Sequence, residues 1–332
     1  MITYVNKVDA EQQMNALGAA AEPFLFVIDY STERNVVLSL EQAREAGIQF
    51  QLSEGAAAPK SPSQKIDFEF EPIPFETYEK AFDLVHSEIL WGNSFLCNLT
   101  VESKVRTNLD LSSIYDLATA KYKLLMPNTF TCFSPETFIK IDNKGIISSF
   151  PMKGTISAEI PDAQNVLLQN QKELYEHHTI VDLIRNDVGI VAEKVWVPKF
   201  RYLEKIEKHD GTAIYQMSSE ISGQLPVLWK SNVGSLLFKM LPAGSISGAP
   251  KKKTLEIIAA AEAHTYFGGE RGFYTGIFGY FDGETMDSAV MIRFVEQRDD
   301  QLFFKSGGGI TFMSTAEEEY AEMLQKIYLP KS

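Results

Sequence analysis

The amino-acid sequence predicts an α+β fold in which antiparallel strands follow one another in groups and helices separate the groups. Strand-like runs come in succession at 129–133, 137–141 and 146–150, and Asp-Asn-Lys-Gly at 142–145 is typical of a hairpin turn. Helical spacing of apolar residues is limited to a few segments, of which 75–90 is one. The regular alternation of strand and helix that a doubly wound parallel sheet needs is absent, so we expect the antiparallel class.

The same patterns predict the other elements. Strands are expected at 24–30, 94–101 and 213–223, followed by a C-terminal meander at 276–281, 289–295 and 301–306, and helices are expected at 161–188, 250–263 and 315–329. Thr315 and Glu318 have capping-box spacing at the start of the last helix, and Pro330 ends it.

We expect a single domain over residues 1–332, with a short N-terminal extension at 1–53. The segment 54–65 is rich in Ala, Ser and Pro, and this composition predicts a flexible surface loop between the extension and the rest of the chain.

Composition excludes several classes of function. The chain carries 31 Lys+Arg and 44 Asp+Glu, a formal net charge of −13, which argues against a nucleic-acid partner because phosphate binding depends on basic patches. No stretch approaches the roughly 20 apolar residues of a membrane helix, and no signal peptide is evident. The two cysteines, Cys97 and Cys132, lie in apolar runs and are expected to be reduced and buried, which favours a cytoplasmic location.

Pairs of acidic residues three positions apart occur on two predicted helices. Glu173 and Glu176 share one face of the first, and Glu319 and Glu322 share one face of the second. Four carboxylates from two helices could converge on Mg²⁺, which prefers oxygen ligands. The alternative is that the second pair merely benefits from the macrodipole in a first helical turn and that Lys326 forms an ordinary i, i+4 ion pair with Glu322.

Two glycine-containing segments indicate sites where backbone N–H groups could approach an anion. Gly307-Gly308-Gly309 follows the last predicted strand, and Gly244-Ser245-Ile246-Ser247-Gly248-Ala249-Pro250-Lys251 leads into a helix N-terminus. The second segment lacks the spacing of a Walker A loop, and both could be tight turns without a ligand.

Lys153 stands at a strand end in Pro151-Met152-Lys153-Gly154-Thr155. A buried lysine amine with a lowered pKa can act as a nucleophile, although most lysines are simply solvated. Zinc-binding Cys/His spacing, a Gly-x-Ser-x-Gly elbow and a Gly-x-Cys-x-Gly glutaminase motif are all absent from the sequence.

Taken in order, these motifs strongly resemble the chorismate-utilising enzymes. The resemblance covers roughly residue 75 to the C-terminus. It rests on the segment around Lys153, on Glu176 followed by Asp182-Leu183-Ile184-Arg185-Asn186-Asp187, on the motif at 244–251, and on Gly279-Tyr280, Ile292-Arg293, Gly307 to Ile310 and Glu319-Tyr320-Ala321-Glu322. It implies two packed antiparallel β-sheets flanked by helices, one active site between them, and Mg²⁺-dependent chemistry on chorismate.

Within that family, the resemblance is closest to aminodeoxychorismate synthase component I, a transferase of para-aminobenzoate and folate biosynthesis. Members of that branch carry Lys at the position of Lys153, whereas anthranilate synthases usually carry Ala. Isochorismate and salicylate synthases use a lysine base that matches Leu96 here, and leucine cannot activate water. The resemblance therefore implies amination of chorismate with ammonia supplied by a separate glutaminase subunit.

The resemblance also implies a role for each site residue. Lys153 would attack the substrate ring and Glu136 would act as the general acid. Substrate would be bound by Tyr280, Arg293, the amides of Gly308 and Gly309, Lys326, Ser247 and Thr155, and Mg²⁺ by Glu173, Glu176, Glu319 and Glu322.

Two departures from the family pattern leave other functions open. Gln216 stands where the family usually has a histidine, and Leu96 replaces a polar residue. The alternatives are an anthranilate synthase component I and, from another class, a catalytically degraded chorismate-binding subunit.

Overall fold

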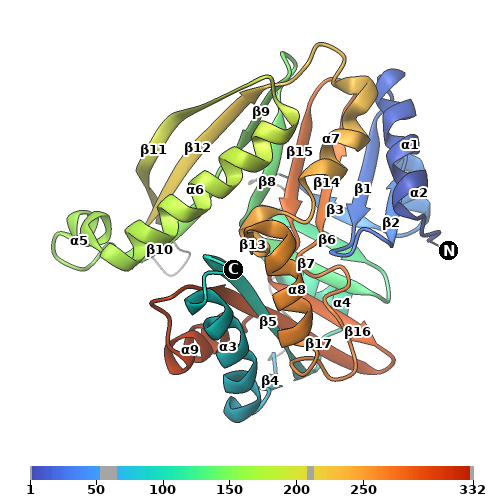
Figure 1. Cartoon of the computed structure of the whole chain (residues 1–332). Helices are drawn as coiled ribbons and strands as arrows, with labels where there is room; N and C mark the ends of the chain where they lie inside the picture. Colours follow the sequence, from blue (N-terminus) through green and yellow to red (C-terminus); the bar gives the residue numbers. More distant parts are fainter. Residues whose placement is uncertain (1, 53–65, 208–212, 330–332) are drawn as a thin grey trace.

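The computed structural model describes residues 2–52, 66–207 and 213–329, apart from the side chains of Lys153 and Lys172. Two antiparallel sheets share a hydrophobic layer, and each sheet carries helices on its other face (Figure 1). This arrangement confirms the predicted α+β class. The predicted loop at 54–65 lies outside the described residues.

The first sheet, sheet A, has the strand order β10-β12-β9-β8-β15-β14-β1-β2, with β11 paired to the other edge of β12. Its strands are β1 (Phe24–Ile28), β2 (Asn35–Leu38), β8 (Thr137–Ile141), β9 (Ile146–Ser149), β10 (Met152–Ser157), β11 (Lys194–Glu207), β12 (Ala213–Gln224), β14 (Ile277–Phe281) and β15 (Met286–Val290).

The second sheet, sheet B, has the order β13-β5-β17-β16-β7-β6-β3, with β4 also paired to β5. Its strands are β3 (Gln49–Gln51), β4 (Phe68–Glu71), β5 (Leu96–Thr107), β6 (Tyr122–Met126), β7 (Phe130–Ser134), β13 (Gly248–Ala249), β16 (Phe294–Arg298) and β17 (Gln301–Ile310).

Most helices lie on the outer faces of the two sheets, whereas α2 (Leu40–Glu45) packs its Ala43 into the layer between them. The others are α1 (Lys7–Ala19), α3 (Phe75–Leu90), α4 (Leu111–Leu117), α5 (Ala163–Gln169), α6 (Gln171–Val191), α7 (Val233–Met240), α8 (Lys251–Glu262) and α9 (Ala316–Gln325), with short 3₁₀ turns η1 (Lys230–Asn232) and η2 (Gly244–Ile246). Buried residues of α1, α6 and α7 pack on sheet A, and those of α3, α4, α8 and α9 pack on sheet B.

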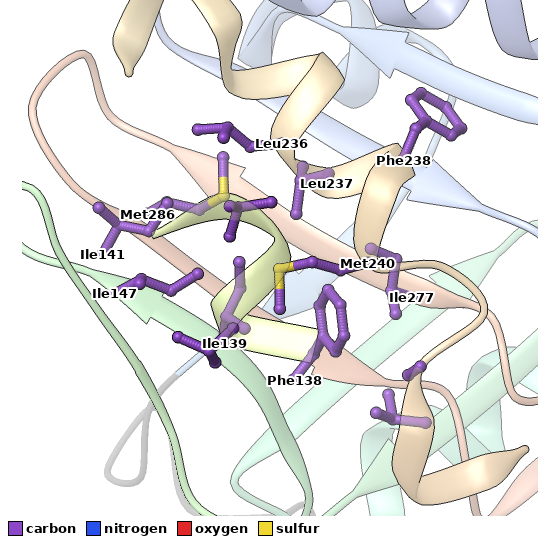
Figure 2. Close-up of a cluster of buried hydrophobic side chains, with 14 of the residues drawn as sticks. Phe138, Ile139, Ile141, Ile147, Leu236, Leu237, Phe238, Met240, Ile277 and Met286 are labelled. Carbon is purple, nitrogen blue, oxygen red and sulfur yellow. The ribbon is translucent and has the colours of Figure 1, made fainter. Parts of the chain in front are cut away.

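The layer under α6 and α7 is a dense apolar core. Figure 2 shows Leu237 and Met240 of α7 directed onto Phe138 and Ile139 of β8, and all four side chains are buried. A side chain of this size contributes roughly 1.5–3 kcal/mol when it leaves water, so this layer holds the helices firmly against sheet A.

The N-terminal segment contributes two strands, β1 and β2, to sheet A. Strand β1 lies between β14 and β2, with Phe24 opposite Phe281 and Ile28 opposite Ile277. All five residues of β1 are buried, because helices cover one face and the layer between the sheets covers the other. Residues 24–38 of the segment expected as a short N-terminal extension are therefore built into sheet A.

The C-terminal strands do not form the single meander that the sequence predicts. Strands β14 and β15 belong to sheet A, whereas β16 and β17 belong to sheet B. The chain crosses between sheets at 291–293, inside the apolar run 289–295 that was expected to be one strand. Both flanking halves are buried, so the apolar run conceals the bend.

Among the described residues, no helix is long and apolar enough to cross a membrane.

Candidate active site

Two crossings of the chain between the sheets lie side by side and carry candidate site residues. The first joins β7 to β8 and contains Glu136, and the second joins β15 to β16 and contains Arg293. The amide of Phe133 donates to the carbonyl of Arg293 at 3.2 Å, and the amide of Val290 donates to the carbonyl of Glu136 at 3.2 Å. These backbone bonds fix the two crossings relative to one another.

The Glu136 carboxyl group has a fixed orientation. Ser245 in η2 donates its hydroxyl to Glu136 Oε1 at 2.5 Å, and the Glu136 amide donates to Ser134 Oγ at 3.0 Å. The predicted general acid is therefore held by the predicted glycine-containing segment at 244–251, which reaches it from another part of the chain.

Arg293 has a backbone conformation that is unusual for its residue type. Its φ angle is +51°, in the left-handed region, which costs a non-glycine residue of order 1 kcal/mol. Its Nε donates to the hydroxyl of Tyr328 at 3.2 Å, and its guanidinium lies 5.4 Å from the centre of that ring. Strain at a crossing between sheets is typical of a functional position.

Tyr274, which the sequence analysis missed, lies closer to this pair of crossings than the predicted Tyr280. In the β14–β15 ladder Ile277 pairs with Val290, so Tyr274 and Arg293 leave the ladder at the same end. Tyr280 pairs with Asp287, about 10 Å farther along the strand, and its ring lies 5.9 Å from that of Phe50. The structure therefore does not bring Tyr280 to this site.

The electrostatic surroundings of Tyr274 support its place in the site. The side chain is 4% exposed, and burial raises the pKa of its hydroxyl group well above the usual value. The positive charges of Arg271 and Arg293 partly oppose that increase, and the carboxylates of Glu262 and Glu136 add to it. The position of Tyr274 before β14, beside Arg271-Gly272, is the sequence signal that could have identified it.

The three consecutive glycines belong to a strand instead of a loop. Gly307, Gly308 and Gly309 extend β17 and pair with Thr100, Leu99 and Asn98 of β5. On the opposite edge, the ladder with β16 ends at Lys305. The glycine backbone therefore has a strand partner on one side and can receive other groups on the other.

The C-terminal helix places its predicted site residues at this glycine segment. Lys326 Nζ donates to the Gly307 carbonyl at 2.9 Å and forms an ion pair with Glu322 at 2.8 Å, so the i, i+4 pair is present. A Cβ atom on Gly308 would lie 3.4 Å from Glu319 Oε2 and 3.5 Å from Lys326 Nζ. These are ordinary van der Waals distances, so the Gly308 backbone lies directly beside both side chains.

Two of the predicted acidic residues are buried. Glu319 is 4% exposed and accepts a hydrogen bond at 2.7 Å from Ser314, and Glu176 of α6 is 8% exposed. Burial raises the pKa of Tyr78 in α3, and the charges of Glu319 and Glu322 raise it further. Negative charge is therefore concentrated at this end of α9.

Helix α6 brings the other acidic pair toward the same region. The Asn170 side chain accepts from the Glu173 amide and begins the helix. The Tyr175 ring meets that of Phe312, just before α9, edge to face at 5.0 Å, and Figure 1 shows the N-terminal end of α6 near α9. Even so, no group of three or more His, Cys, Asp or Glu side chains in the described part of the chain lies close enough to hold a metal ion.

The backbone of the segment around Lys153 lies close to the carboxylate of Glu173. Lys153 is in β10, and its side chain lies outside the described part of the structure. The next residue, Gly154, has φ +77°, and a Cβ there would lie 2.8 Å from Glu173 Oε2. Thr155 is exposed and pairs with Gln216, the residue at the position of the usual family histidine.

The remaining predicted residues of this region have structural contacts. The buried Ser247 hydroxyl donates to the Ala243 carbonyl at 2.8 Å and so closes the turn. Leu96 is buried and pairs with Ala249. At the start of α8, Lys251 contacts Asp187 at 2.7 Å, so this helix N-terminus faces a carboxylate of the chain itself. Burial raises the pKa of Asp187, and the Lys251 ammonium opposes that increase.

Comparison with known proteins identifies the family. The model of the chorismate binding enzyme family matches residues 8–331. A Haemophilus influenzae protein described as an uncharacterized PabA-like protein is 47% identical over 320 residues, which cover 96% of this chain and 95% of that protein. Aminodeoxychorismate synthase component 1 of Escherichia coli is 36% identical over 204 residues, 58% of this chain and 42% of that enzyme.

Solved structures share the fold. The menaquinone-specific isochorismate synthase of Escherichia coli has a TM-score of 0.71 at 16% identity, covering 98% of this chain and 82% of that one. Anthranilate synthase component I from Streptococcus pneumoniae has a TM-score of 0.62 at 23% identity, covering 98% and 78%. The two packed sheets, the match over nearly the whole chain and the resemblance of the motifs agree, and the chain belongs to the family of chorismate-binding enzymes.

Proposed function

We propose that this chain is the aminating component of an aminodeoxychorismate synthase. It would replace the C4 hydroxyl of chorismate with an amino group from ammonia, giving 4-amino-4-deoxychorismate and water. The observation that carries the proposal is the Glu136–Ser245 pair beside Arg293, in a chain with lysine at 153. The 36% identity to the Escherichia coli enzyme over 204 residues is consistent with it.

Glu136 would act as the proton donor. Hydroxide is a poor leaving group, so the C4 oxygen must gain a proton as its bond to carbon breaks. The Ser245 hydroxyl group donates to Glu136 Oε1 and so orients the carboxyl group that would deliver the proton.

Lys153 would act as the nucleophile. Its neutral amine would add to ring carbon C2 and lose a proton while the C4 hydroxyl, protonated by Glu136, leaves as water, and both conjugated ring double bonds would shift, from C1=C2 and C5=C6 to C1=C6 and C4=C5. Ammonia would then add at C4, and the same shift in reverse would expel the lysine amine. Support comes from the backbone of β10, where Gly154 lies against the Glu173 carboxylate.

Each of the two carboxylates of chorismate needs a positively charged group of the protein to bind it. Arg293, with Tyr274 at the same end of the strand ladder, would hold the enolpyruvyl carboxylate together with the amides of Gly308 and Gly309. Lys326, which already reaches the Gly307 carbonyl, would contact the ring carboxylate.

Mg²⁺ would neutralise the repulsion between the ring carboxylate and the acidic helices. The donor set of Glu173, Glu176, Glu319 and Glu322 consists of carboxylate oxygens, the ligand type that Mg²⁺ prefers. No three of them lie close enough to hold the ion in the described structure, so the cation and the substrate would have to draw α6 and α9 together. Bound there, the cation would supply electrostatic stabilisation of the substrate anion.

A glutaminase subunit would supply the ammonia, since the sequence contains no Gly-x-Cys-x-Gly motif of its own. The source of nitrogen can be separated from the chemistry experimentally, because ammonium salts at alkaline pH provide ammonia without the partner.

The test is to incubate the purified chain with chorismate, Mg²⁺ and an ammonium salt, and to identify the products by mass spectrometry. We expect 4-amino-4-deoxychorismate. Its absence at every ammonia concentration would count against the proposal, and anthranilate with pyruvate would favour an anthranilate synthase instead. Tight chorismate binding without turnover would favour a non-catalytic subunit.

Lys153→Ala tests the nucleophile separately. We expect turnover to fall at least 100-fold, and rapid quenching of the wild-type enzyme should trap a chorismate-derived adduct on the peptide that contains Lys153. Full activity of the variant would remove this role from Lys153 but would leave the aminating reaction in place.

A further inference from the structure

A buried ion pair joins α6 to α8 and has no part in the chemistry proposed above. Asp187 of α6 is 4% exposed, and its Oδ1 accepts a hydrogen bond at 2.7 Å from Lys251 Nζ at the start of α8. A buried ion pair often adds little stability relative to apolar side chains of similar size, because desolvation offsets the attraction. We therefore ask which segment of the chain this pair holds in place.

The pair closes the segment 241–250, which contains the 3₁₀ turn η2. Lys251 Nζ also donates to the carbonyl of Met240, the last residue of α7, at 2.9 Å. The residues on either side of the segment are thus joined through one ammonium group, and Asp187 connects that group to α6. Buried residues of α6 belong to the core of sheet A, so the connection has a rigid base.

Asp187 also lies directly against the turn itself. A Cβ atom on Gly244, the first residue of η2, would lie 2.7 Å from Asp187 Oδ2 and 2.9 Å from Cγ of Leu183, one turn earlier in α6. A side chain at position 244 would have to displace one of them. Burial raises the pKa of Asp187, and the Gly244 amide is among the groups that oppose this increase. The start of η2 is therefore seated on α6.

The other end of the turn is fixed to sheet B. The carbonyl of Ser247 accepts a hydrogen bond at 2.9 Å from the amide of Asn98 in β5, and β13, which follows, pairs with the same strand. Between these two anchors stands Ser245, whose hydroxyl donates to Glu136 Oε1 at 2.5 Å. The direction of that hydroxyl group therefore depends on how both ends of η2 are held.

We propose that Asp187, through its pair with Lys251, is a positioning residue that directs the Ser245 hydroxyl onto Glu136. It would not touch chorismate. It would hold η2 against α6, so that the proton donor keeps one orientation before substrate arrives. The inference rests on the proposed role of Glu136 as proton donor. The alternative is that the pair only stabilises the start of α8, in which case catalysis would not depend on Asp187 through Ser245.

A double-mutant cycle on the full chain, with chorismate, Mg²⁺ and ammonium salt, tests this dependence. Asp187→Asn keeps the shape of the side chain and removes its charge, and Ser245→Ala removes the hydroxyl. We expect each to lower kcat about tenfold, the value of one hydrogen bond to a charged group, with the KM for chorismate within about twofold. The double variant should be no slower than Ser245→Ala, because both changes remove the same interaction.

Two results of the cycle would overturn the proposal. Independent effects would multiply to about 100-fold in the double variant, and a normal kcat in Asp187→Asn would show that the turn holds without the pair. Lys251→Gln breaks the pair from its more exposed side, since this side chain is 23% exposed, and should give the same loss of kcat.

Glu102→Gln is the matched control for stability. Glu102 in β5 is fully buried and pairs with Arg298 at 2.6 Å, and its other hydrogen bonds in the described structure go to Thr265 and Phe267 and not to η2 or Glu136. Its Tm should fall, but its kcat should stay within about twofold of the wild type. A loss of kcat as large as that of Asp187→Asn would mean that lower stability explains both, and would refute the positioning role.

Crystal structures of the ligand-free variants give a measurement that needs no turnover. In Asp187→Asn we expect the Ser245 hydroxyl to lie more than about 3.5 Å from Glu136, beyond hydrogen-bond distance, whereas Glu102→Gln should keep the contact. An unchanged contact in Asp187→Asn would refute the positioning role even if the aminating reaction is confirmed. A wild-type chain without turnover would instead refute the proposed function and leave these structures to decide.

Discussion

The two ends of the candidate active site are built in different ways. At one end, Glu136 and Arg293 sit on crossings between the sheets that backbone hydrogen bonds hold together. At the other, acidic side chains come from α6 and α9, which belong to the cores of different sheets. Their link includes an edge-to-face contact between Tyr175 and Phe312.

Because they are built differently, one end of the site is expected to be rigid and the other to be adjustable. Strand ladders fix backbone positions to a fraction of an ångström, which suits a proton donor and a carboxylate clamp that must be correctly placed before substrate arrives. Helix faces that meet through a few side chains can adjust, which suits a site completed by a metal ion and a charged substrate. The predictions below test this division, from the largest expected effect to the smallest.

Glu136→Gln should cause the largest loss of activity. The amide keeps the hydrogen bond from Ser245 but cannot donate a proton to the leaving oxygen, so kcat should fall about 10²–10⁴-fold. The KM for chorismate should stay within about twofold, and steady-state kinetics with ammonium salt measures both. A large KM effect with normal kcat would show that Glu136 binds substrate instead.

Removal of Mg²⁺ should greatly reduce turnover without disturbing the end of the site that contains Glu136 and Arg293. After treatment with EDTA we expect at least a 100-fold loss of activity, recovered on adding Mg²⁺, because the ring carboxylate would face uncompensated acids. Glu319→Gln should raise the Mg²⁺ concentration needed for half-maximal rate. Full activity of a metal-free preparation would contradict the proposed role of the acidic helices.

Substitutions of Tyr274 and Tyr280 should affect chorismate binding to different extents. Tyr274→Phe should raise the KM for chorismate about five- to tenfold by removing one hydrogen bond near Arg293, whereas Tyr280→Phe should change it less than twofold. The reverse order would restore the original expectation from sequence and would move the substrate along the β14–β15 ladder.

Gly154→Ala tests the close packing at the acidic end. A Cβ at a φ of +77° is strained and would approach Glu173 Oε2 to 2.8 Å. We expect a loss of about 1–3 kcal/mol in the free energy of unfolding and a higher Mg²⁺ concentration for half-maximal rate, measured by urea denaturation and by metal titration. Gly92→Ala is the matched control, because Gly92 also has a positive φ, +80°, but beyond its two chain neighbours no atom of the described residues lies within 4 Å of its added Cβ.

Alkaline pH should weaken the fold through Tyr274. Its pKa is raised in the folded protein, so the unfolded chain loses the phenolic proton first as pH rises. The contribution is constant below about pH 10, the ordinary tyrosine value, and stability then falls as pH increases. Urea denaturation between pH 8 and 11 should show a shallower decline for Tyr274→Phe than for the wild type.

Sequence patterns located most elements but not the crossings. The boundaries of α3 and α8 agree closely with the expected 75–90 and 250–263, because each has an apolar stripe with the helical period. The crossing at 291–293 was missed since residues on both sides of it are apolar and buried. The spacing of apolar residues indicates whether a segment is buried, but it does not indicate which sheet the segment joins.

The glycine segment shows the same limit. Three successive glycines have no intrinsic preference for a strand, and by composition they predict a loop. Pairing with Asn98 to Thr100 of β5, about 200 residues earlier in the chain, makes Gly307 to Gly309 part of β17. No local pattern could have predicted this partner.

What the sequence determined by itself is the set of chemical groups and their local setting. Acidic pairs three apart share a helix face and Thr315 begins α9, because each of these depends on a few neighbouring residues. Lys153, which was expected just after a strand end, instead lies inside β10. Tertiary structure alone decided which groups meet. Tyr274 replaced Tyr280 beside Arg293, and Ser245 reached Glu136 across more than 100 residues, since burial and strand register are properties of the whole packed chain.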